Sequence, residues 1–385
     1  MVPTGRPVNE FETLSRVNKN NFSKHCFNQF SPYTIMSLYS AVIVGLTGIG
    51  SGRKDVSPLG RMPRSHAAAY YAHPDTTVVA VCDLRPEALK EFKKTWGDVW
   101  PDLKYYTDYR KMLEERKPDI LSVVTPDDAH AKIVIDGSAY GIPVILCEKP
   151  IATTLAEADL MTRTCEENGT LLSIEHTRRW DPSFVDALTL IQSEELGPLR
   201  TIVGEMFSPR AMLFRNGIHL IDLFNFYAQV PAKWVFSELE MGFDTFREYS
   251  GDGGRSPDSD PYASAYIHYE NGIRGFFNSY KTTFPGWQMQ LTCENGRLHL
   301  SDRNMRVIRA SSHYQWEESD LVTEPHMYTH QLGAIAELVT ALKGEEVSLS
   351  CPPKEARKAL ELVIAMLKSH TEGNRRVDLP LGELC

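Results

Sequence analysis

The sequence predicts two joined domains: an α/β domain on a doubly wound parallel sheet, then an α+β domain on an open, mainly antiparallel β-sheet. Three observations predict this class. Short apolar runs rich in β-branched residues recur in the first half of the chain, as buried parallel strands require. Helical patterns alternate with these runs. Beyond residue 200, strand-like stretches are joined by Asn-Gly turns instead, and such turns favour antiparallel hairpins.

Four strands and at least two helices are expected in the first domain. The helices are predicted over residues 86–94, which open with a proline, and over residues 129–140, where apolar side chains recur at three-to-four spacing up to Gly141. The strands are predicted at residues 40–45, 77–83, 120–125 and 143–148.

The second domain should contain two hairpins and two closing helices. The hairpins turn at Asn271-Gly272 and Asn295-Gly296. The helices are expected over residues 327–342 and 353–370, and the second is followed by Gly373, a residue that commonly ends helices. This last helix can pack back on the first domain.

The length of 385 residues suits two domains, because a single hydrophobic core seldom grows beyond roughly 250 to 300 residues. We expect an N-terminal extension over residues 1–37, which are polar and aperiodic. The α/β domain is expected over residues 38–150, and the α+β domain over residues 151–385. Residues 248–260, rich in Gly, Ser and Asp, predict a mobile loop.

Composition and charge point to a small molecule as the partner. With 42% hydrophobic and 24% charged residues, the chain has the composition of a globular protein. Its formal net charge of -9 repels nucleic acid and anionic membranes, and no run of about 18 apolar residues predicts a membrane span. The seven cysteines are scattered and never at zinc or redox spacing. We therefore expect no metal site and a reducing, cytoplasmic location.

A glycine-rich stretch follows the first strand, where a bound pyrophosphate would need close approach of the backbone and a helix N-terminus. It contains no strict GxGxxG. In a compact register, Gly45, Gly48 and Gly50 form the phosphate-binding turn. A turn of this kind after a parallel strand gives a Rossmann-type nucleotide site.

A second register explains more of the sequence. Gly45-Leu46 and Gly60-Arg61-Met62 would form the two halves of the turn, separated by an insertion between residues 47 and 59. Pro63 then stands where a glycine is expected, and the first turn of a helix tolerates proline. The helix itself is predicted over residues 64–70.

The end of the second predicted strand favours NAD over NADP. Asp83 lies where a carboxylate can accept hydrogen bonds from the ribose hydroxyls and would repel a 2′-phosphate. Arg85 keeps NADP as an alternative, since its guanidinium could hold that phosphate. Asp83 could also be only a turn or helix-capping residue before Pro86.

Further motifs follow along the chain in a fixed order. They are Thr125-Pro126-Asp127-Asp128-Ala129-His130, Cys147-Glu148-Lys149-Pro150, Arg178-Arg179-Trp180-Asp181-Pro182, Gly197-Pro198-Leu199-Arg200 and Gly217-Ile218-His219-Leu220-Ile221-Asp222. Each is weak alone. Together with the glycine loop, over roughly residues 40–382, they resemble the Gfo/Idh/MocA oxidoreductases, the family of glucose-fructose oxidoreductase and inositol dehydrogenase.

The resemblance implies a dinucleotide site built from the ends of several strands. In this family the lysine of Glu-Lys-Pro contacts both the nicotinamide ribose and the substrate. The cofactor-binding residues expected here are Gly45, Leu46, Gly48, Gly60, Met62, Pro63, Asp83, Leu84, Arg85, Thr125, Pro126, His130, Glu148, Lys149, Pro150 and Arg179.

Three residues are expected to be catalytic. Lys149 follows a strand's carboxyl end, where open α/β sheets bind ligands, and its ammonium can hydrogen-bond a reacting oxygen. His219 is the second proton-transfer candidate, because the ordinary histidine pKa of about 6.5 suits acid–base work. Asp222 would share its helix face and orient or polarise the cluster. His219 could instead only pack or cap a helix.

One position departs from the family's pattern. Sugar and inositol dehydrogenases of the family often carry Asp four residues before the histidine, and here that residue is Arg215. Together with Arg178, Arg179 and Arg210, Arg215 could bind an acidic or phosphorylated sugar. We expect substrate contacts from Lys149, Arg178, Arg215, His219 and Tyr280.

The sequence thus predicts an NAD-dependent oxidoreductase that transfers hydride to or from a hydroxyl carbon of a sugar, polyol or sugar derivative. Two alternatives remain open: a glycoside hydrolase or lyase that oxidises its substrate transiently, and a ligand sensor without activity. The expected partners are a sugar-like small molecule and further copies of the chain, as a homodimer or homotetramer formed through the open C-terminal sheet.

Overall fold

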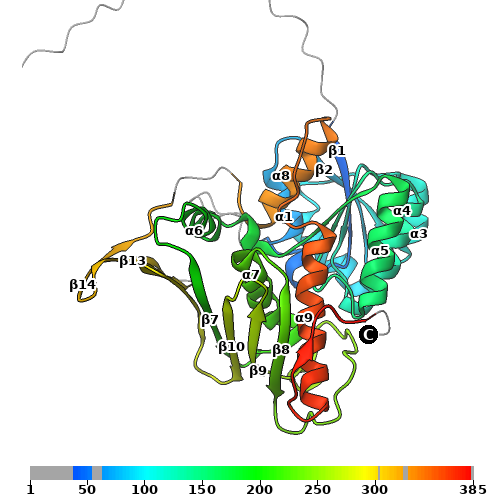
Figure 1. Ribbon diagram of the computed structural model, residues 1–385. Helices are drawn as coiled ribbons and strands as arrows, with labels where there is room; N and C mark the ends of the chain where they lie inside the picture. The colour runs from blue at the N-terminus through cyan, green and yellow to red at the C-terminus, as the bar shows by residue number, and fades with distance from the viewer. Residues whose placement is uncertain (1–37, 54–62, 302–303, 324–327, 383–385) are drawn as a thin grey trace, which may run out of the picture. The chain divides into compact units, whose positions relative to one another are not determined.

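The computed structural model describes residues 38–53, 63–301, 304–323 and 328–382 (Figure 1). None of the helices in these ranges combines the length and the apolar character that crossing a membrane requires.

The first sheet has six parallel strands in the order β3-β2-β1-β4-β5-β6. This order changes direction between β1 and β4, and open α/β sheets bind ligands at the carboxyl ends of the strands at such a point. The sequence prediction of a doubly wound parallel sheet is confirmed. The strands are β1 (Tyr39–Val44), β2 (Thr76–Cys82), β3 (Lys104–Tyr106), β4 (Ile120–Val123), β5 (Val144–Cys147) and β6 (Leu171–Ile174).

Local signals start and stop the helices between these strands. The Ser65 side chain caps the first helix by accepting the Ala68 N–H at 3.1 Å. Pro86 opens the second, and Gly169, with a φ of 70°, ends the fifth. The helices are α1 (His66–Ala72), α2 (Pro86–Trp96), α3 (Tyr109–Arg116), α4 (His130–Ala139) and α5 (Leu155–Asn168), with short 3₁₀ turns η1 (Gly48–Gly50) and η2 (Asp127–Ala129).

The parallel sheet extends beyond residue 150, where the sequence analysis ended the first domain. After Lys149-Pro150 the chain forms α5 and returns to add β6, whose residues pair in parallel register with β5. The four residues 171–174 were not identified as a strand, because the first domain was expected to end at residue 150.

The second sheet has nine strands in the order β14-β13-β12-β11-β7-β10-β9-β8-β15. Only β7 and β10 pair in parallel; the other neighbours are antiparallel, as predicted. The strands are β7 (Leu199–Ser208), β8 (Ala232–Leu239), β9 (Ala263–Tyr269), β10 (Arg274–Lys281), β11 (Gly286–Cys293), β12 (Gly296–Ser301), β13 (Met305–Ser312), β14 (Gln315–Asp320) and β15 (Val377–Asp378).

Helices cover one face of this sheet. The helix α7 (Ile218–Ala228) packs on β7, and α9 (Pro353–Thr371) packs on β8 (Figure 1). The same helix α9 also contacts α5 and β6, so it joins the two sheets. Two further helices, α6 (Pro182–Gln192) and α8 (His330–Leu342), lie near the boundary, and α8 contacts α1.

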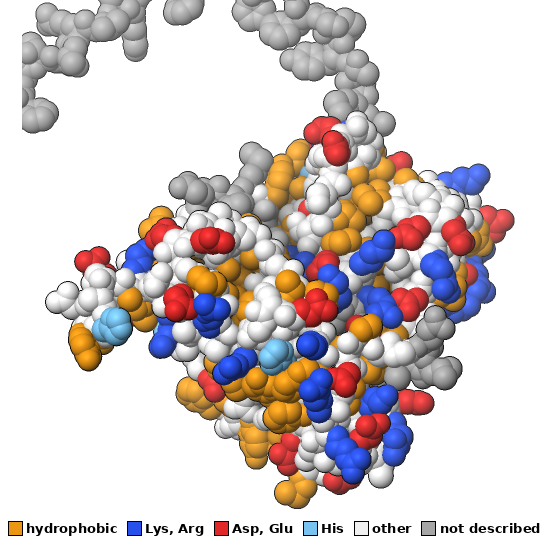
Figure 2. Space-filling view, viewed as in Figure 1, with side chains coloured by type: hydrophobic (Ala, Val, Ile, Leu, Met, Phe, Trp, Pro, Cys, Tyr) orange, Lys and Arg blue, Asp and Glu red, His pale blue; other side chains and the backbone are white. Residues whose placement is uncertain are grey.

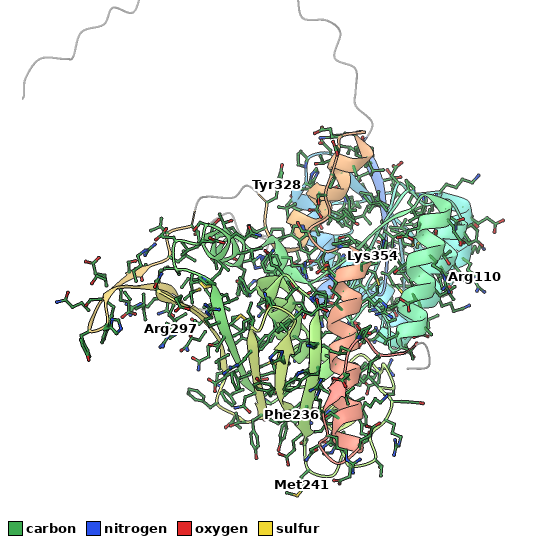
Figure 3. The ribbon with its side chains drawn as sticks, viewed as in Figure 1. Arg110, Phe236, Met241, Arg297, Tyr328 and Lys354 are labelled. Atoms are coloured by element: carbon green, nitrogen blue, oxygen red, sulfur yellow. The ribbon has the colours of Figure 1, made fainter. Side chains whose placement is uncertain are left out.

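The other face of the second sheet carries exposed aromatic side chains. On β10 the side chains alternate, so that Phe277 is buried while Phe276 and Tyr280 are exposed. Trp234 and Phe236 stack on this face at 6.3 Å between ring centroids. Figure 2 shows hydrophobic side chains gathered over β8 to β10, and Figure 3 marks Phe236 within this region.

Candidate active site

The loop after β1 is shaped by glycine. Gly45 has a φ of 95°, and a Cβ added to it would lie 2.3 Å from the backbone oxygen of Val124, so no other residue allows this approach of β1 to β4. Gly48 also has a positive φ, with open space where a side chain would be. The loop therefore leaves room for a ligand beside its backbone.

The structure describes only some of the residues of the two proposed glycine registers. Gly60 and Met62 lie outside the described residues, and Pro63 is the buried residue from which the chain enters α1. Before residue 54, the Ser51 carbonyl accepts a hydrogen bond from the Trp96 indole at 2.8 Å, and the Arg53 guanidinium donates to the Thr95 carbonyl at 2.6 Å. The beginning of the insertion is thus fixed to α2.

Asp83 lies at the carboxyl end of β2 and is nearly buried. Its carboxylate accepts the backbone N–H of Leu46 at 3.0 Å and of Arg85 at 2.9 Å, and the Arg85 guanidinium at 3.2 and 3.3 Å. The Arg85 side chain is 58% exposed, whereas that of Asp83 is 8% exposed, so a surface guanidinium covers a buried carboxylate. Leu84 is exposed. The structure brings the predicted Leu46, Asp83 and Arg85 together.

Residues after β4 and β5 complete the nucleotide side of the site. The hydroxyl of Thr125 is buried and has no hydrogen-bond partner among the described residues, which fits a group waiting for a bound ligand. The His130 ring lies between two backbone oxygens, 2.8 Å from that of Pro150 and 3.2 Å from that of Thr125. His130 therefore links the residues that follow β4 to those that follow β5. Pro126 comes directly after Thr125 in this region.

Lys149 is 94% buried by surface area, with 6% exposed. Its ammonium donates to the backbone carbonyl of Arg215 at 2.6 Å, across the boundary between the two sheets. Burial, reinforced by the nearby Arg215 charge, lowers the pKa of Lys149 to about 8. A lysine with this pKa can give up or take a proton near neutral pH.

A buried hydrogen-bond chain lies under Lys149. The Glu148 carboxylate accepts from the His66 Nε2 at 3.3 Å, and the His66 Nδ1 lies 2.9 Å from the Ser122 hydroxyl, which in turn lies 2.8 Å from the Tyr70 hydroxyl. Burial opposes the charge of Glu148, but the hydrogen bond and charge of His66, together with the charges of Lys149 and Arg215, lower the pKa of Glu148. The charge of Glu148 raises the pKa of Lys149 in turn.

His219, at the start of α7, is half-buried. Its pKa is lowered well below the ordinary value, first by desolvation and then by the charges of Lys149 and Arg178. The ring is therefore neutral near pH 7. Lys149 follows β5 of the first sheet and His219 lies on α7, which packs on the second sheet, yet the charge of Lys149 is close enough to lower the pKa of His219.

Asp222 does not contact His219 directly. Its carboxylate accepts two hydrogen bonds from Arg179, both at 2.9 Å. Between Asp222 and His219 lies His176, whose Nδ1 is 3.7 Å from the carboxylate and whose ring centroid is 5.8 Å from that of His219. Both His176 nitrogens are buried without a hydrogen-bond partner among the described residues.

Arg179 was expected at the cofactor, but the structure places it in this ion pair. It is 6% exposed and also donates to the Ser350 carbonyl at 3.0 Å. Its burial explains the difference, since a buried guanidinium needs a carboxylate more than a ligand contact. The sequence analysis missed His176 because the strand before it was not recognised.

Arg215 was expected to bind substrate. The structure shows it paired with Asp127 at 2.6 Å, with a quarter of its side chain exposed. Asp127 also accepts the Tyr249 hydroxyl at 2.7 Å. Asp127, although part of a motif noted in the sequence, was not assigned a role, and Tyr249 gave no signal because it lies in a loop predicted to be mobile.

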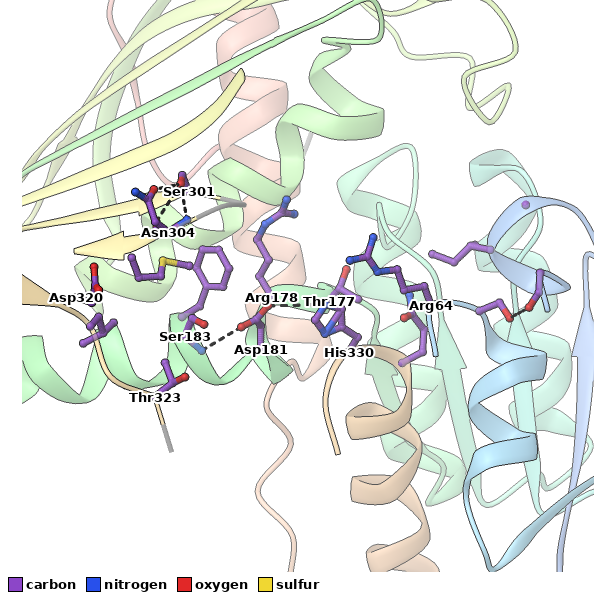
Figure 4. A pocket seen from close by; sticks show the side chains of 18 residues that line it. Arg64, Thr177, Arg178, Asp181, Ser183, Ser301, Asn304, Asp320, Thr323 and His330 are labelled. Carbon is purple, nitrogen blue, oxygen red and sulfur yellow. Dashed lines mark hydrogen bonds and ion pairs between the residues drawn. The ribbon is translucent and has the colours of Figure 1, made fainter. Parts of the chain in front are cut away.

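A cleft of about 1220 Å³ opens between the glycine loop and the rim of the second sheet (Figure 4). Gly48 and Ser65 line one end, and Arg178 lines its middle. The Arg178 guanidinium lies 4.4 Å over the Trp287 ring. Lys149 and His219 are not lining residues of this cleft, but Arg178 is near enough to His219 to lower its pKa.

Tyr280 lies away from this cleft, contrary to the expectation that it binds substrate. Its side chain is on the open face of the second sheet, 4.6 Å from the Tyr262 ring. The neighbouring Phe277 points to the other face and packs against Phe224 of α7. Because side chains alternate along a strand, Tyr280 cannot reach His219, which α7 carries.

No group of three or more metal-ligating side chains occurs in the described ranges. The five cysteines that the structure describes are buried and free.

The chain resembles known proteins both in sequence and in structure. Residues 58–176 match the Gfo/Idh/MocA family model, described as an oxidoreductase family with an NAD-binding Rossmann fold. Among curated proteins, the chain is 28% identical to D-apiose dehydrogenase of Paraburkholderia graminis over 63% of this chain and 65% of that protein. It is 27% identical to myo-inositol 2-dehydrogenase of Thermotoga maritima, over 66% and 76%. The match thus spans less than two thirds of the apiose dehydrogenase.

Solved structures show the same fold over nearly the whole described chain. The WlbA dehydrogenase of Bordetella pertussis, solved with NADH and UDP-GlcNAcA, aligns with a TM-score of 0.69 and 18% identity, covering 90% of this chain and 100% of that one. Aldose-aldose oxidoreductase of Caulobacter crescentus aligns with a TM-score of 0.70 and 17% identity, covering 89% and 100%. The motifs and the sheets agree with the family match, which identifies residues 58–176 with the NAD-binding Rossmann part of the Gfo/Idh/MocA oxidoreductases.

Proposed function

We propose that this protein is an NAD-dependent dehydrogenase that transfers hydride between the cofactor and a hydroxyl carbon of a sugar or polyol. One observation supports this most directly. Lys149, with a pKa of about 8, follows β5 at the carboxyl end of the parallel strands, and its charge helps to lower the pKa of His219 on α7, which is neutral. Alcohol oxidation needs such a pair, because it releases a proton for each hydride.

The chain's residues fit a bound dinucleotide. The glycine loop leaves backbone space at Gly48, the Thr125 hydroxyl awaits a partner, and Asp83 stands at the end of β2. Asp83 already holds Arg85, which favours NAD because the guanidinium is not free for a 2′-phosphate. When bound, the cofactor would supply the hydride acceptor.

The proton is handled by the protein. In the oxidation direction, neutral His219 accepts the hydroxyl proton, and the ammonium of Lys149 hydrogen-bonds the oxygen as negative charge develops on it. In the reduction direction the same steps run in reverse: protonated His219 returns the proton to the oxygen, and the Lys149 ammonium again hydrogen-bonds that oxygen during the transfer. The low pKa of His219 keeps its imidazole neutral in the resting enzyme, which suits a base.

The substrate class rests on the relatives, whose names are those of dehydrogenases of apiose and inositol. Both compounds are polyhydroxylated and uncharged. The ion pairs of Arg179 and Arg215 within the protein also fit a neutral substrate better than the acidic sugar that the sequence suggested.

We also propose that copies of the chain associate through the open face of the second sheet. Its stacked aromatics, including Trp234, Phe236 and Tyr266, form an exposed apolar surface of the kind that mediates association. The buried free cysteines are consistent with a cytoplasmic location.

The test is a screen of neutral sugars, polyols, sugar acids and glycosides with NAD, following NADH absorbance and products together. We expect NADH to form with a neutral polyol or aldose, and Lys149→Ala to abolish it. The matched control is Lys354→Ala, which removes an exposed lysine. Product formation without added NAD and without net NADH would show transient oxidation instead. Binding of sugar without any turnover would indicate a sensor.

A further inference from the structure

The segment after residue 248 is packed tightly against the active site. The Tyr249 ring stacks on Phe214 at 4.4 Å between centroids, and the Gly251 carbonyl accepts the Asp128 N–H at 3.2 Å. The Leu213 N–H donates to the Pro261 carbonyl at 2.8 Å. This segment thus contacts both the turn after β4 and η4, a single π-helical turn (Leu213–Gly217) before α7.

Asp127 is the point where three parts of the chain meet. It is 1% exposed, and its carboxylate accepts the Arg215 guanidinium at 2.6 Å and the Tyr249 hydroxyl at 2.7 Å. Asp127 follows β4 of the first sheet, Arg215 lies in η4, and Tyr249 lies in the segment between β8 and β9. A buried carboxylate with two such partners fixes their relative positions.

Asp260 holds the backbone of the same turn. It is fully buried, and its two oxygens accept the N–H groups of Phe214 at 3.1 Å and Arg215 at 2.9 Å. Both the side chain and the backbone N–H of Arg215 are therefore bound by carboxylates from different segments. The Arg215 carbonyl, which receives the Lys149 ammonium, has little freedom to move.

This arrangement has a consequence for Lys149. An ammonium has three N–H donors. The Arg215 carbonyl takes one of them at 2.6 Å, so the directions of the other two are set by where that carbonyl lies. Those two remain for the reacting oxygen and the cofactor.

We propose that Asp127, Arg215 and Tyr249 form a clasp across the two sheets that positions the Lys149 amine for proton transfer. The inference rests on the proposed function, in which Lys149 handles the substrate proton. Arg215 is in this view a positioning residue that acts through its carbonyl and its charge. It does not anchor the substrate.

The charges of the clasp act on Lys149 with opposite signs. The groups that influence its amine are Glu148, Asp127 and Asp260, which raise its pKa, and Arg215, which lowers it; the neighbouring rings are His176 and His219, on both of which the Lys149 charge acts. Removing the charge of Asp127 should therefore lower the pKa of Lys149, and removing that of Arg215 should raise it. A merely structural contact would not give shifts of opposite sign.

The test measures the Lys149 amine directly, without catalysis. The full-length protein is labelled with acetic anhydride over a pH series, and acetylation of Lys149 is quantified by mass spectrometry against exposed Lys354 in the same sample. We expect the midpoint to shift down by about one pH unit in Asp127→Asn and up by about one unit in Arg215→Met. Asp128→Asn, the same chemical change at an exposed neighbour, should leave it unchanged.

Tyr249→Phe is the milder variant, because it keeps the stacked ring and removes only the hydroxyl hydrogen bond to Asp127. Tyr249→Phe should fold even if Asp127→Asn does not. We expect the labelling midpoint of Lys149 to shift to higher pH by a smaller amount, because the Asp127 carboxylate then has one hydrogen bond fewer. Midpoints equal to wild type in both Asp127→Asn and Arg215→Met, or shifts of the same sign, would overturn the clasp.

Activity assays on the same variants separate this inference from the proposed function. If the labelling midpoints shift as expected, and the basic limb of kcat for carbonyl reduction shifts with them, both stand. If the midpoints shift but wild type turns over no sugar or polyol with NAD, the clasp stands and the proposed function fails.

Discussion

Two cations are buried near the active site, and their surroundings differ. Arg179 faces a carboxylate through two hydrogen bonds at 2.9 Å, and the pKa of its guanidinium is raised despite the cost of burial. Lys149 has a carbonyl as its nearest acceptor and a second cation beside it, and its pKa is lowered to about 8. A buried cation that pairs with a carboxylate through two hydrogen bonds therefore stays charged. A buried cation whose acceptor is neutral has a lowered pKa and can exchange a proton near neutral pH.

The largest expected effect comes from removing the titratable cation. Lys149→Met should lower kcat/KM by about 10² to 10⁴, the range of acid–base catalysis, measured by steady-state kinetics against Lys354→Met. Because lowering the pKa from 10.5 to about 8 costs roughly 3 kcal/mol at neutral pH, the variant should unfold at the same or higher denaturant concentration. A clear loss of stability would show that Lys149 is structural.

The fixed cation should behave in the opposite way. Asp222→Asn leaves Arg179 buried without its carboxylate and is expected to reduce the free energy of unfolding by about 3 to 5 kcal/mol, measured by urea denaturation. Removing both charges, in Asp222→Asn with Arg179→Met, should recover much of this loss. The exposed Asp320 provides the control, as Asp320→Asn. Equal stability of Asp222→Asn and wild type would contradict the view that buried Arg179 depends on the Asp222 carboxylate.

The pH dependence distinguishes the two proton carriers. The Lys149 ammonium is lost as pH rises through about 8, so kcat for carbonyl reduction should fall about tenfold per unit above that value. The pKa of His219 is lowered well below 6.5, so the base for oxidation stays available below pH 6.5. A loss of oxidation with a midpoint at the ordinary histidine value would contradict the proposed role of His219.

The smallest effect concerns a third pair, Asp83 with Arg85, in which the guanidinium is mostly exposed. Asp83→Ser removes a negative charge from the ribose site and frees Arg85. We expect the ratio of the dissociation constants for NADPH and NADH to shift about tenfold toward NADPH, measured by fluorescence titration. Glu87→Gln, the loss of a nearby charge outside the site, should leave the ratio unchanged.

The sequence predicted the architecture well where periodicity and turn residues agree. The runs ending at Gly45, Asp83 and Glu148 became parallel strands, and both Asn-Gly turns joined antiparallel ones. These signals are local, since they depend on residues close together in the chain. Two strands of the parallel sheet, β3 and β6, of three and four residues, were not predicted.

The candidate site was predicted less completely, because its contacts join distant residues. Lys149 and His219 could be identified from their motifs, but nothing in the sequence shows that Arg179 pairs with Asp222 or Arg215 with Asp127. The guanidinium of an arginine can donate its paired N–H groups either to a ligand or to a carboxylate of the protein. Only the fold decides which one it meets, and Tyr280 likewise could be assigned to a sheet face only from the register of β10.

The loop that carries Tyr249 contains three glycines with left-handed backbone, Gly251, Gly253 and Gly254. A Cβ on Gly251 would lie 2.6 Å from the Asp128 nitrogen, and one on Gly254 would lie 3.0 Å from the Arg215 side chain. Random mutagenesis should therefore find few tolerated replacements here, although the only regular element among the described residues of the loop is the short 3₁₀ turn η5 (Pro257–Ser259). Variant libraries intended to change the substrate of this protein would do better to leave these three positions as they are.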